Sequence, residues 1–194
     1  MFQSMGKTMS RAFSDVTSKA LLISTNHEKH FPECDTIKKI CAKEVEKGIH
    51  RLNGKNMKKE HFKDHSSPFY KYTSVSRTIV RNSWLIHFLT VMLDHLEKFP
   101  EKKVSKCAKE AYSVALGPHH PAIVRAGASL ALLSCPKRTK FLPRILGMLW
   151  FINLGKDVQD GEVNERLREI LKRLEPLNES LQKYLVEQDF TKLP

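Results

Sequence analysis

Apolar residues recur at intervals of three and four along almost the whole chain. Between about Ser74 and Phe99, for example, Leu85, Phe88, Met92 and Leu96 follow this spacing. Such spacing places side chains on one face of an α-helix, whereas a half-buried strand requires alternation with a period of two. No period-two alternation longer than a few residues occurs. The pattern therefore predicts an all-α fold.

Breaks in this pattern divide the chain into seven expected helices. We place them at residues 1–24, 35–52, 74–99, 102–116, 121–134, 139–154 and 161–184. Asp35 is the expected cap of the second helix, Gly117 and Pro118 end the fourth, and Pro176 is expected to bend the last. The polar segment from 53 to 73 contains Pro68 and is expected to be a surface loop.

Length and charge narrow the class of protein. A chain of 194 residues with 41% hydrophobic composition fits one domain, which we expect to span residues 1–194. Lysine and arginine total 33 against 21 acidic residues, a formal charge of +12. Such a surplus attracts polyanions, so nucleic acid, anionic membranes and phosphorylated ligands are all candidates.

Cysteine usage and the apolar runs predict a cytosolic, soluble protein. The four cysteines form no CxxC pair and follow no secretory signal, so we expect reduced thiols. The longest apolar runs, residues 85–93 and 145–154, are shorter than the roughly 18 residues that span a bilayer. No His or Cys spacing matches a zinc site, and no metal or cofactor is expected.

Two pairs of charged residues extend apolar helix faces. Arg77 and Arg81 share the face of Trp84 in the third expected helix, and Asp15 and Lys19 are also four residues apart in the first. Each pair has an ordinary interpretation, as a surface ion pair or as arginines that extend toward solvent. If the two helices pack with these ends adjacent, however, three cations surround one carboxylate, and a phosphate would balance the surplus. Spacing leaves both interpretations open.

Three segments resemble a known family. They are SDVTSK at Ser14–Lys19, SRTIVR at Ser76–Arg81 and AYSVALGPHHPAIVR at Ala111–Arg125. Together they are similar to the glycolipid transfer protein superfamily and, within it, most similar to ceramide-1-phosphate transfer proteins. The resemblance implies a two-layer sandwich of helices around a pocket for lipid chains. It also implies transfer of one phosphorylated sphingolipid at a time between membranes, without enzymatic chemistry.

The resemblance also implies the headgroup residues. Asp15 would accept the sphingoid amide N–H, His120 would meet the amide carbonyl, and Lys19, Arg77 and Arg81 would hold the phosphate. Glycolipid-binding members have a Trp at the position of Arg81, so Arg81 favours phosphate over sugar. The neighbouring His119 is expected to be a solvated loop residue.

Two departures from the family pattern keep alternatives open. The sequence resembles a member without the family's N-terminal helix, so a phosphosphingolipid sensor that does not transfer its lipid is an alternative. Glycolipid transfer is a separate alternative. Ala122 also stands where relatives often have a Trp that meets the membrane. Ile123, Trp150 and the basic residues Lys137, Arg138 and Lys140 could still contact an anionic membrane surface transiently.

Other classes have less support in the sequence. A nucleic-acid-binding protein would suit the charge, but no finger, recognition-helix or aromatic stacking motif occurs. A hydrolase using His120 lacks a nucleophile motif such as GxSxG. We expect a monomer that does not bind nucleic acid.

Overall fold

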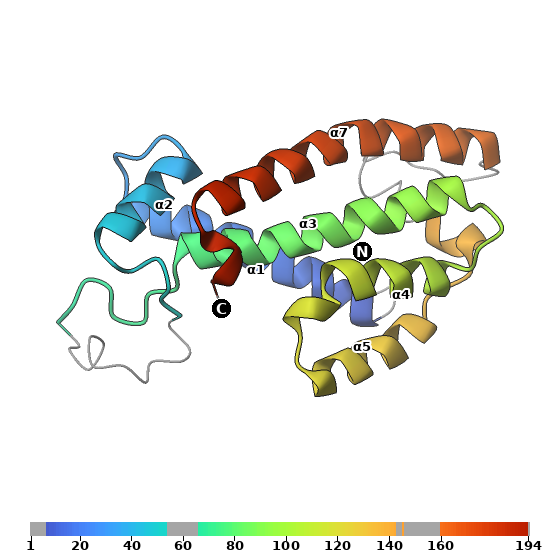
Figure 1. Ribbon diagram of the computed structural model, residues 1–194, viewed down its shortest axis with the longest axis horizontal. Coiled ribbons are helices and arrows are strands. Elements are labelled where there is room, and N and C mark those ends of the chain that lie inside the picture. Colours follow the sequence, from blue (N-terminus) through green and yellow to red (C-terminus); the bar gives the residue numbers. More distant parts are fainter. Residues whose placement is uncertain (1–6, 54–65, 143–144, 146–159, 194) are drawn as a thin grey trace. The chain divides into compact units, whose positions relative to one another are not determined.

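The structure is a computed structural model that describes residues 7–53, 66–142, 145 and 160–193, with the side chains of residues 7–13, 15, 16, 160 and 162 outside the description. All the regular elements of this described part are helices, as predicted (Figure 1). The α-helices are α1 Lys7–His30, α2 Ile37–Glu46, α3 Val75–Lys98, α4 Val104–Ala115, α5 Ala122–Leu133 and α7 Asp160–Glu187. Two short 3-10 helices, η3 Gly117–His119 and η4 Phe190–Lys192, are also present.

The chain divides into two compact units. Unit 1 comprises Met1–Ser14 and Ser83–Gln182, and unit 2 comprises Asp15–Asn82 and Lys183–Pro194. Helices α1, α3 and α7 each contribute residues to both. The expectation of one domain over residues 1–194 stays a prediction.

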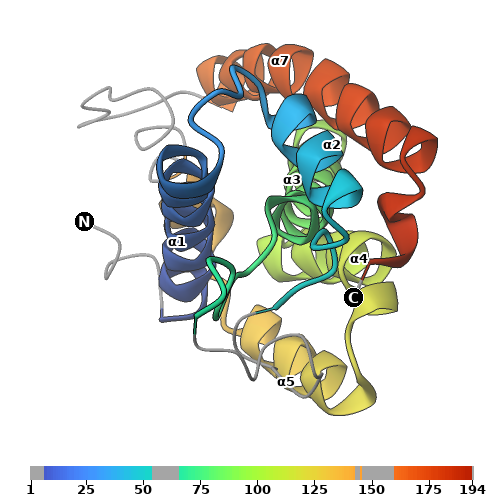
Figure 2. The same ribbon diagram turned by 90° about the vertical axis from the view of Figure 1, so that its left-hand side faces the viewer.

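Unit 1 is built on a core shared by α3, α4, α5 and α7. The buried side chains of α4 recur at intervals of three and four residues, which is the spacing of a single helical face. Leu96 of α3, Cys107 of α4 and Leu167 of α7 are fully buried in this core. Figure 2 shows α5 beside α4, with η3 connecting them. The apolar periodicity that predicted these helices therefore also builds the core.

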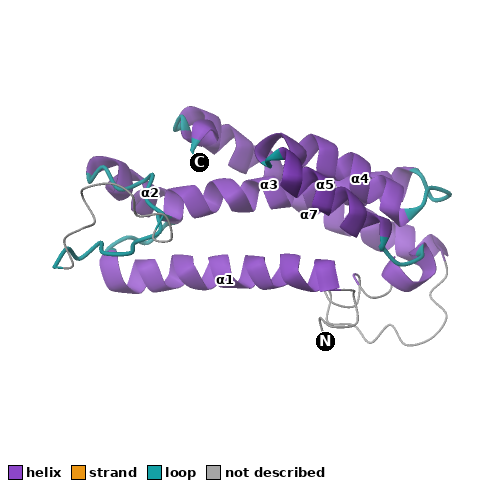
Figure 3. Ribbon diagram, turned by 90° about the horizontal axis from the view of Figure 1, so that it is seen from below, coloured by secondary structure: helices purple, strands orange, loops and turns teal. Residues whose placement is uncertain are grey.

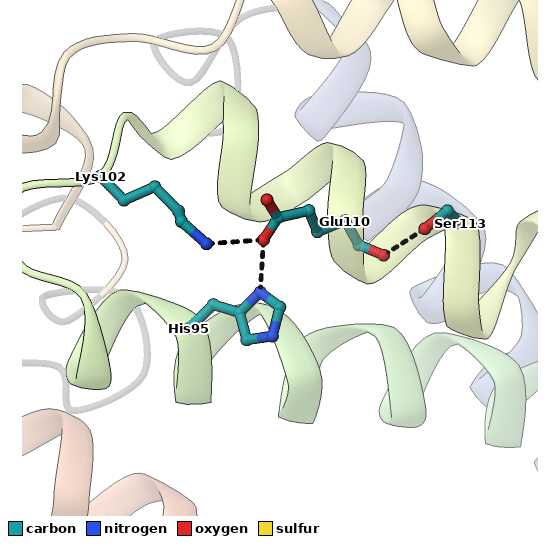
Figure 4. Close-up of polar contacts among 4 residues, drawn as sticks. All are labelled: His95, Lys102, Glu110 and Ser113. Atoms are coloured by element: carbon teal, nitrogen blue, oxygen red, sulfur yellow. Dashed lines mark hydrogen bonds and ion pairs between the residues drawn. The ribbon is translucent and has the colours of Figure 1, made fainter.

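Polar contacts fix α7 and α4 against α3 within unit 1. Arg168 Nε lies 2.6 Å from Glu97 Oε1, and Asn178 Nδ2 lies 3.2 Å from His87 Nδ1. On the α4 side, Glu110 Oε2 lies 2.8 Å from Lys102 Nζ and 3.2 Å from His95 Nδ1 (Figure 4). Glu110 therefore points toward α3 and the start of α4.

The Glu110 cluster makes stability depend on acid pH. The hydrogen bond from Lys102 holds the pKa of the Glu110 carboxyl below 4.5, and the charges of His95 and Lys106 lower it further. A carboxyl whose pKa is depressed by folding stabilises above its unfolded value and loses that contribution as pH falls through the folded value. The free energy of unfolding, measured with urea, should fall between about pH 6 and pH 3 in the wild type, and we expect this fall to be smaller in Glu110→Gln. Glu101→Gln, an exposed control, should keep the wild-type pH dependence; equal slopes for wild type and Glu110→Gln would contradict the assignment.

Unit 2 contains the end of α1, α2, the start of α3 and the C-terminal residues. Asn26 Nδ2 of α1 donates to the carbonyl of Thr73, just before α3, at 2.8 Å. From this point α1 and α3 run antiparallel (Figures 1 and 3). Phe31, Phe69 and Tyr72 form an aromatic cluster, with the Phe69 and Tyr72 ring centroids 5.4 Å apart. This cluster packs the loop before α3 against the end of α1.

A buried carboxylate of α2 caps α3. Glu44 is 0% exposed and accepts hydrogen bonds from the Tyr72 hydroxyl at 2.5 Å and from the backbone N–H groups of Val75 and Ser76 at 2.6 and 2.8 Å. The Ser76 hydroxyl adds a fourth bond at 2.5 Å. The first N–H groups of a helix have no intrahelical acceptor, and a negative charge there is favourable. Glu44 therefore fixes where α3 begins.

Several predicted boundaries need correction. Helix α1 continues to His30 rather than ending at Ser24, and α2 ends at Glu46 rather than at 52. Thr36, not Asp35, is the N-cap of α2, because its side chain accepts from the Lys39 N–H, while Asp35 pairs with the Lys39 ammonium. Pro176 lies inside α7, which continues to Glu187. Of the helix predicted at 139–154, residues 139–142 and 145 are helical and the rest lie outside the described residues.

The cysteines and helix lengths agree with the sequence analysis. Cys34, Cys41, Cys107 and Cys135 are all free thiols. Burial raises the pKa of the Cys41 thiol to about 11, which keeps it protonated and unreactive at neutral pH. In the described part of the chain, every helix is too short or too polar to cross a bilayer.

Candidate functional site

Arg77 and Arg81 lie on the first turns of α3, in unit 2. Arg77 is only 6% exposed and Arg81 is half-buried. Burial lowers the pKa of the Arg77 guanidinium, and the charge of Arg81 lowers it further. The structure thus brings two guanidinium groups together at the edge of a core, where an anion would be strongly favoured.

The start of α3 is held rigidly beneath these arginines. The Ser74 hydroxyl accepts from the Arg77 N–H at 3.0 Å and donates to the His50 carbonyl at 2.6 Å. Together with the Glu44 contacts, these bonds satisfy the N–H groups of the first three residues of the helix. The backbone that carries Arg77 is therefore fixed from α2 and from the preceding loop.

Lys19 lies on α1, in the same compact unit as Arg81 on α3. Asn26 of α1 contacts Thr73, and from there the two helices run antiparallel (Figure 3). Lys19 precedes Asn26 by about 10 Å of helix and Arg81 follows Val75 by about 9 Å, at 1.5 Å per residue. Lys19 is half-buried. Asp15 lies one turn further along α1, and its side chain is outside the described part of the structure.

His120 belongs to unit 1 and is oriented by its own neighbours. Its Nδ1 lies 2.7 Å from the hydroxyl of Tyr112, a buried residue of α4. Its backbone N–H donates to Gly117 at 3.2 Å, and its carbonyl accepts from Arg125 Nη1 at 3.3 Å. The ring therefore has a fixed direction, with Nε2 as its second polar atom.

His119 differs in part from the expectation of a solvated loop residue. It is exposed, but its ring stacks on Trp84 with 3.9 Å between centroids and 2° between planes. Burial lowers the pKa of His119, and the neighbouring His120 lowers it further, which favours the neutral form of the ring. Its role is to pack η3 against α3.

Sequence reasoning missed Glu44 and Tyr112. Glu44 does carry a signal, because it shares a helical face with the apolar residues Ile40 and Cys41. Val45 is 45% exposed and Glu44 is buried. Tyr112 carries no such signal, since its contact with His120 depends on how η3 folds back onto α4.

Comparison with known proteins decides the family. The profile of the family described as "Glycolipid transfer protein (GLTP)" matches residues 1–147. The chain belongs to the glycolipid transfer protein family. This is a family of lipid transfer proteins rather than of enzymes, and it confirms the resemblance found in the three sequence segments. A search of curated protein sequences gave no match.

Solved structures agree on the glycolipid transfer protein fold. The mouse ceramide-1-phosphate transfer protein in its apo form has a TM-score of 0.75 at 24% identity, covering 99% of this chain and 82% of that one. The human protein in complex with 2:0 ceramide-1-phosphate also scores 0.75, at 23% identity, covering 100% and 82%. A structure of FAPP2, described as selecting simple glycosphingolipids with this fold, scores 0.71 at 17% identity, covering 99% and 81%. These likenesses confirm the all-α fold class, a helical fold of the glycolipid transfer protein type.

Proposed function

We propose that the chain binds ceramide-1-phosphate and transfers it between membranes. Lys19, Arg77 and Arg81 hold the phosphate, Asp15 accepts the sphingoid amide N–H, and His120 meets the amide carbonyl. The observation that carries the proposal is the pair of guanidinium groups on α3, one of them buried, with a half-buried Lys19 on α1 in the same unit.

Charge balance supports a phosphorylated ligand. A buried cation beside a second cation is costly, and a phosphate with up to two negative charges offsets that cost. Guanidinium groups offer forked donors that match phosphate oxygens, and Lys19 adds a point charge. A sugar offers no charge to balance, so Arg77 and Arg81 favour the phosphate.

The related structures support the same ligand class. The human relative is described in complex with ceramide-1-phosphate, as is a mutant form of Arabidopsis ACD11, which scores 0.68 at 14% identity. The FAPP2 structure has a similar TM-score but is described with glycosphingolipids. Since the fold accommodates both classes, the choice between them rests on Arg77 and Arg81.

The proposed mechanism is extraction without covalent chemistry. Burying one methylene from water is favourable by about 0.8 kcal/mol, and this free energy is similar in a bilayer and in an apolar protein interior. Moving a methylene from the bilayer into the protein therefore exchanges one hydrophobic environment for another. The chains therefore move at little net cost, and the headgroup contacts select the lipid. No cofactor takes part in this proposal.

A transient anionic membrane surface is the proposed partner. Ile123, at the start of α5, is 83% exposed, and Lys137 and Lys140 are exposed nearby in the sequence. Trp150, also expected in this contact, lies outside the described residues. Unchanged binding to anionic vesicles in Lys137→Gln/Lys140→Gln would argue against the contact, as loss of two cations should weaken it.

A matched lipid pair tests the ligand. Vesicles containing either 12:0 ceramide-1-phosphate or 12:0 ceramide are incubated with the protein and removed by centrifugation. The lipid left bound to the protein is then measured by mass spectrometry. We expect up to one ceramide-1-phosphate per chain and at least about tenfold less ceramide, since each charge-assisted hydrogen bond contributes about 1.5–3 kcal/mol.

Equal extraction of the two lipids would contradict a phosphate site. Galactosylceramide serves as the third lipid in the same assay. Its extraction in place of ceramide-1-phosphate would support glycolipid transfer instead.

Removing the Tyr112 hydroxyl should weaken lipid binding modestly. In Tyr112→Phe, His120 loses the hydrogen bond that orients its ring, and such bonds contribute about 0.5–1.5 kcal/mol. We expect ceramide-1-phosphate affinity to fall about three- to tenfold. Tyr70→Phe removes a hydroxyl in unit 2 and serves as the control. An unchanged affinity in Tyr112→Phe would contradict the proposed contact between His120 and the lipid.

A further inference from the structure

A surface cleft of about 480 Å³ lies in unit 1, between α4 and α5. Its walls include Lys109, Tyr112 and Ser113 from α4 and Arg125 and Ser129 from α5. Gly117 of η3 also lines it, and a Cβ there would meet the Tyr112 carbonyl oxygen at 3.2 Å. None of the lining residues is assigned a contact with the ceramide-1-phosphate headgroup, although Tyr112 and Arg125 hold His120 from behind.

The cleft has two positive charges and no carboxylate in its lining. Lys109 and Arg125 form no ion pair with any carboxylate among the described residues. The acidic neighbour of Lys109, Glu110, points toward Lys102 and His95 instead (Figure 4). Burial raises the pKa of the Tyr112 hydroxyl, and the charge of Arg125 offsets part of that rise. The lining of the cleft therefore carries a net positive charge.

Several hydrogen-bond donors line the same cleft. Arg125 uses one guanidinium nitrogen, Nη1, for the His120 carbonyl, which leaves its other donors available. The Ser129 hydroxyl makes no hydrogen bond to a described residue. The Ser113 hydroxyl already donates to the Glu110 carbonyl at 2.7 Å, so it is not counted as a donor. An ammonium, part of a guanidinium and a hydroxyl remain.

We propose that the cleft between α4 and α5 is a second anion site that binds a phosphate group through Lys109, Arg125 and Ser129. A phosphate offers several acceptor oxygens and up to two negative charges, which matches two cations and one hydroxyl. A carboxylate would balance only one of the cations. The phosphate can come from a soluble phosphate compound or from a phospholipid headgroup, because the recognised chemistry is the same.

Site-resolved NMR separates this site from the headgroup site. ¹⁵N-labelled protein is titrated with inorganic phosphate at constant ionic strength, in the wild type and in Arg81→Gln. Saturable shifts in α4 and α5 that persist in Arg81→Gln report on the cleft, whereas shifts in α3 report on the proposed headgroup site. The experiment can therefore contradict the cleft proposal without contradicting the headgroup proposal, and the reverse.

The charge-removal variants supply the control. In Lys109→Gln/Arg125→Gln we expect the apparent affinity for phosphate at α4 and α5 to fall at least about tenfold, from the loss of two charge-assisted contacts. Lys103→Gln/Lys172→Gln removes the same charge from two exposed positions outside the cleft lining and should bind as the wild type does. Shifts that do not saturate, or equal loss in both double variants, would overturn the proposal.

Vesicles identify the source of the phosphate. Binding is compared for phosphatidylcholine vesicles that carry phosphatidic acid or phosphatidylglycerol, matched for surface charge. A preference for phosphatidic acid, lost in Lys109→Gln/Arg125→Gln but kept in Lys103→Gln/Lys172→Gln, assigns the site to a lipid headgroup. Saturable phosphate binding without this preference assigns it to a soluble phosphate compound.

Discussion

Replacing Glu44 by alanine should lower the free energy of unfolding by about 3–5 kcal/mol, because four buried donors lose their acceptor. These donors are the Tyr72 and Ser76 hydroxyls and the N–H groups of Val75 and Ser76. Tyr72, Val75 and Ser76 are all at most 4% exposed, so water does not replace the carboxylate without rearrangement. Urea unfolding followed by circular dichroism measures the effect.

Glu46→Ala is the matched control for Glu44→Ala. Glu46 lies on the same helix, is exposed, and pairs with Lys43 at 3.3 Å. Exposed pairs of this kind contribute about 0.3–0.5 kcal/mol, so its loss should be small. If the two variants differ by less than about 1 kcal/mol, Glu44 does not hold the start of α3 as the buried network implies.

Arg81→Gln should abolish selective binding of ceramide-1-phosphate without lowering stability. Losing a guanidinium from a phosphate contact removes up to two charge-assisted hydrogen bonds. The affinity for ceramide-1-phosphate should therefore fall by about 30-fold or more. Repulsion between Arg77 and Arg81 disappears at the same time, and like charges four apart destabilise a helix. The melting temperature should therefore stay the same or rise. Lipid extraction and thermal unfolding of the same preparation measure both effects.

Arg51→Gln is the control for Arg81→Gln. Arg51 is exposed in unit 2, outside the proposed site, and its Nε lies 3.3 Å from His50 Nε2. The change in net charge is the same, so general attraction to anionic lipid falls equally in both variants. Comparable losses of extraction would mean that overall charge, rather than the arginines of α3, attracts the lipid.

The sequence predicted the helices where apolar spacing was uninterrupted. Helix α3 was expected at 74–99 and extends from Val75 to Lys98. The predicted end of α1 at residue 24 was wrong, because the helix continues past Asn26, whose side chain donates to the Thr73 carbonyl. That partner lies 47 residues away in the chain, and local propensity carries no information about it.

The candidate site could be predicted only in part. Spacing placed Arg77 and Arg81 on one helix face, and the family resemblance gave them a role. The burial of Arg77, the caps from Glu44 and Ser74, and the contact of Tyr112 with His120 all depend on tertiary packing. His119 shows the same limit, since its stacking on Trp84 joins residues 35 positions apart in the sequence.

Vesicle-to-vesicle transfer of fluorescent ceramide-1-phosphate, with fluorescent galactosylceramide as the comparison lipid, tests the central claim most directly. The account predicts that the chain accelerates transfer of the phosphate lipid alone and that Arg81→Gln loses this activity while Arg51→Gln keeps it. Saturable binding of ceramide-1-phosphate without transfer would contradict the transfer step and leave a lipid sensor. Transfer of galactosylceramide in preference to ceramide-1-phosphate would contradict the phosphate site itself.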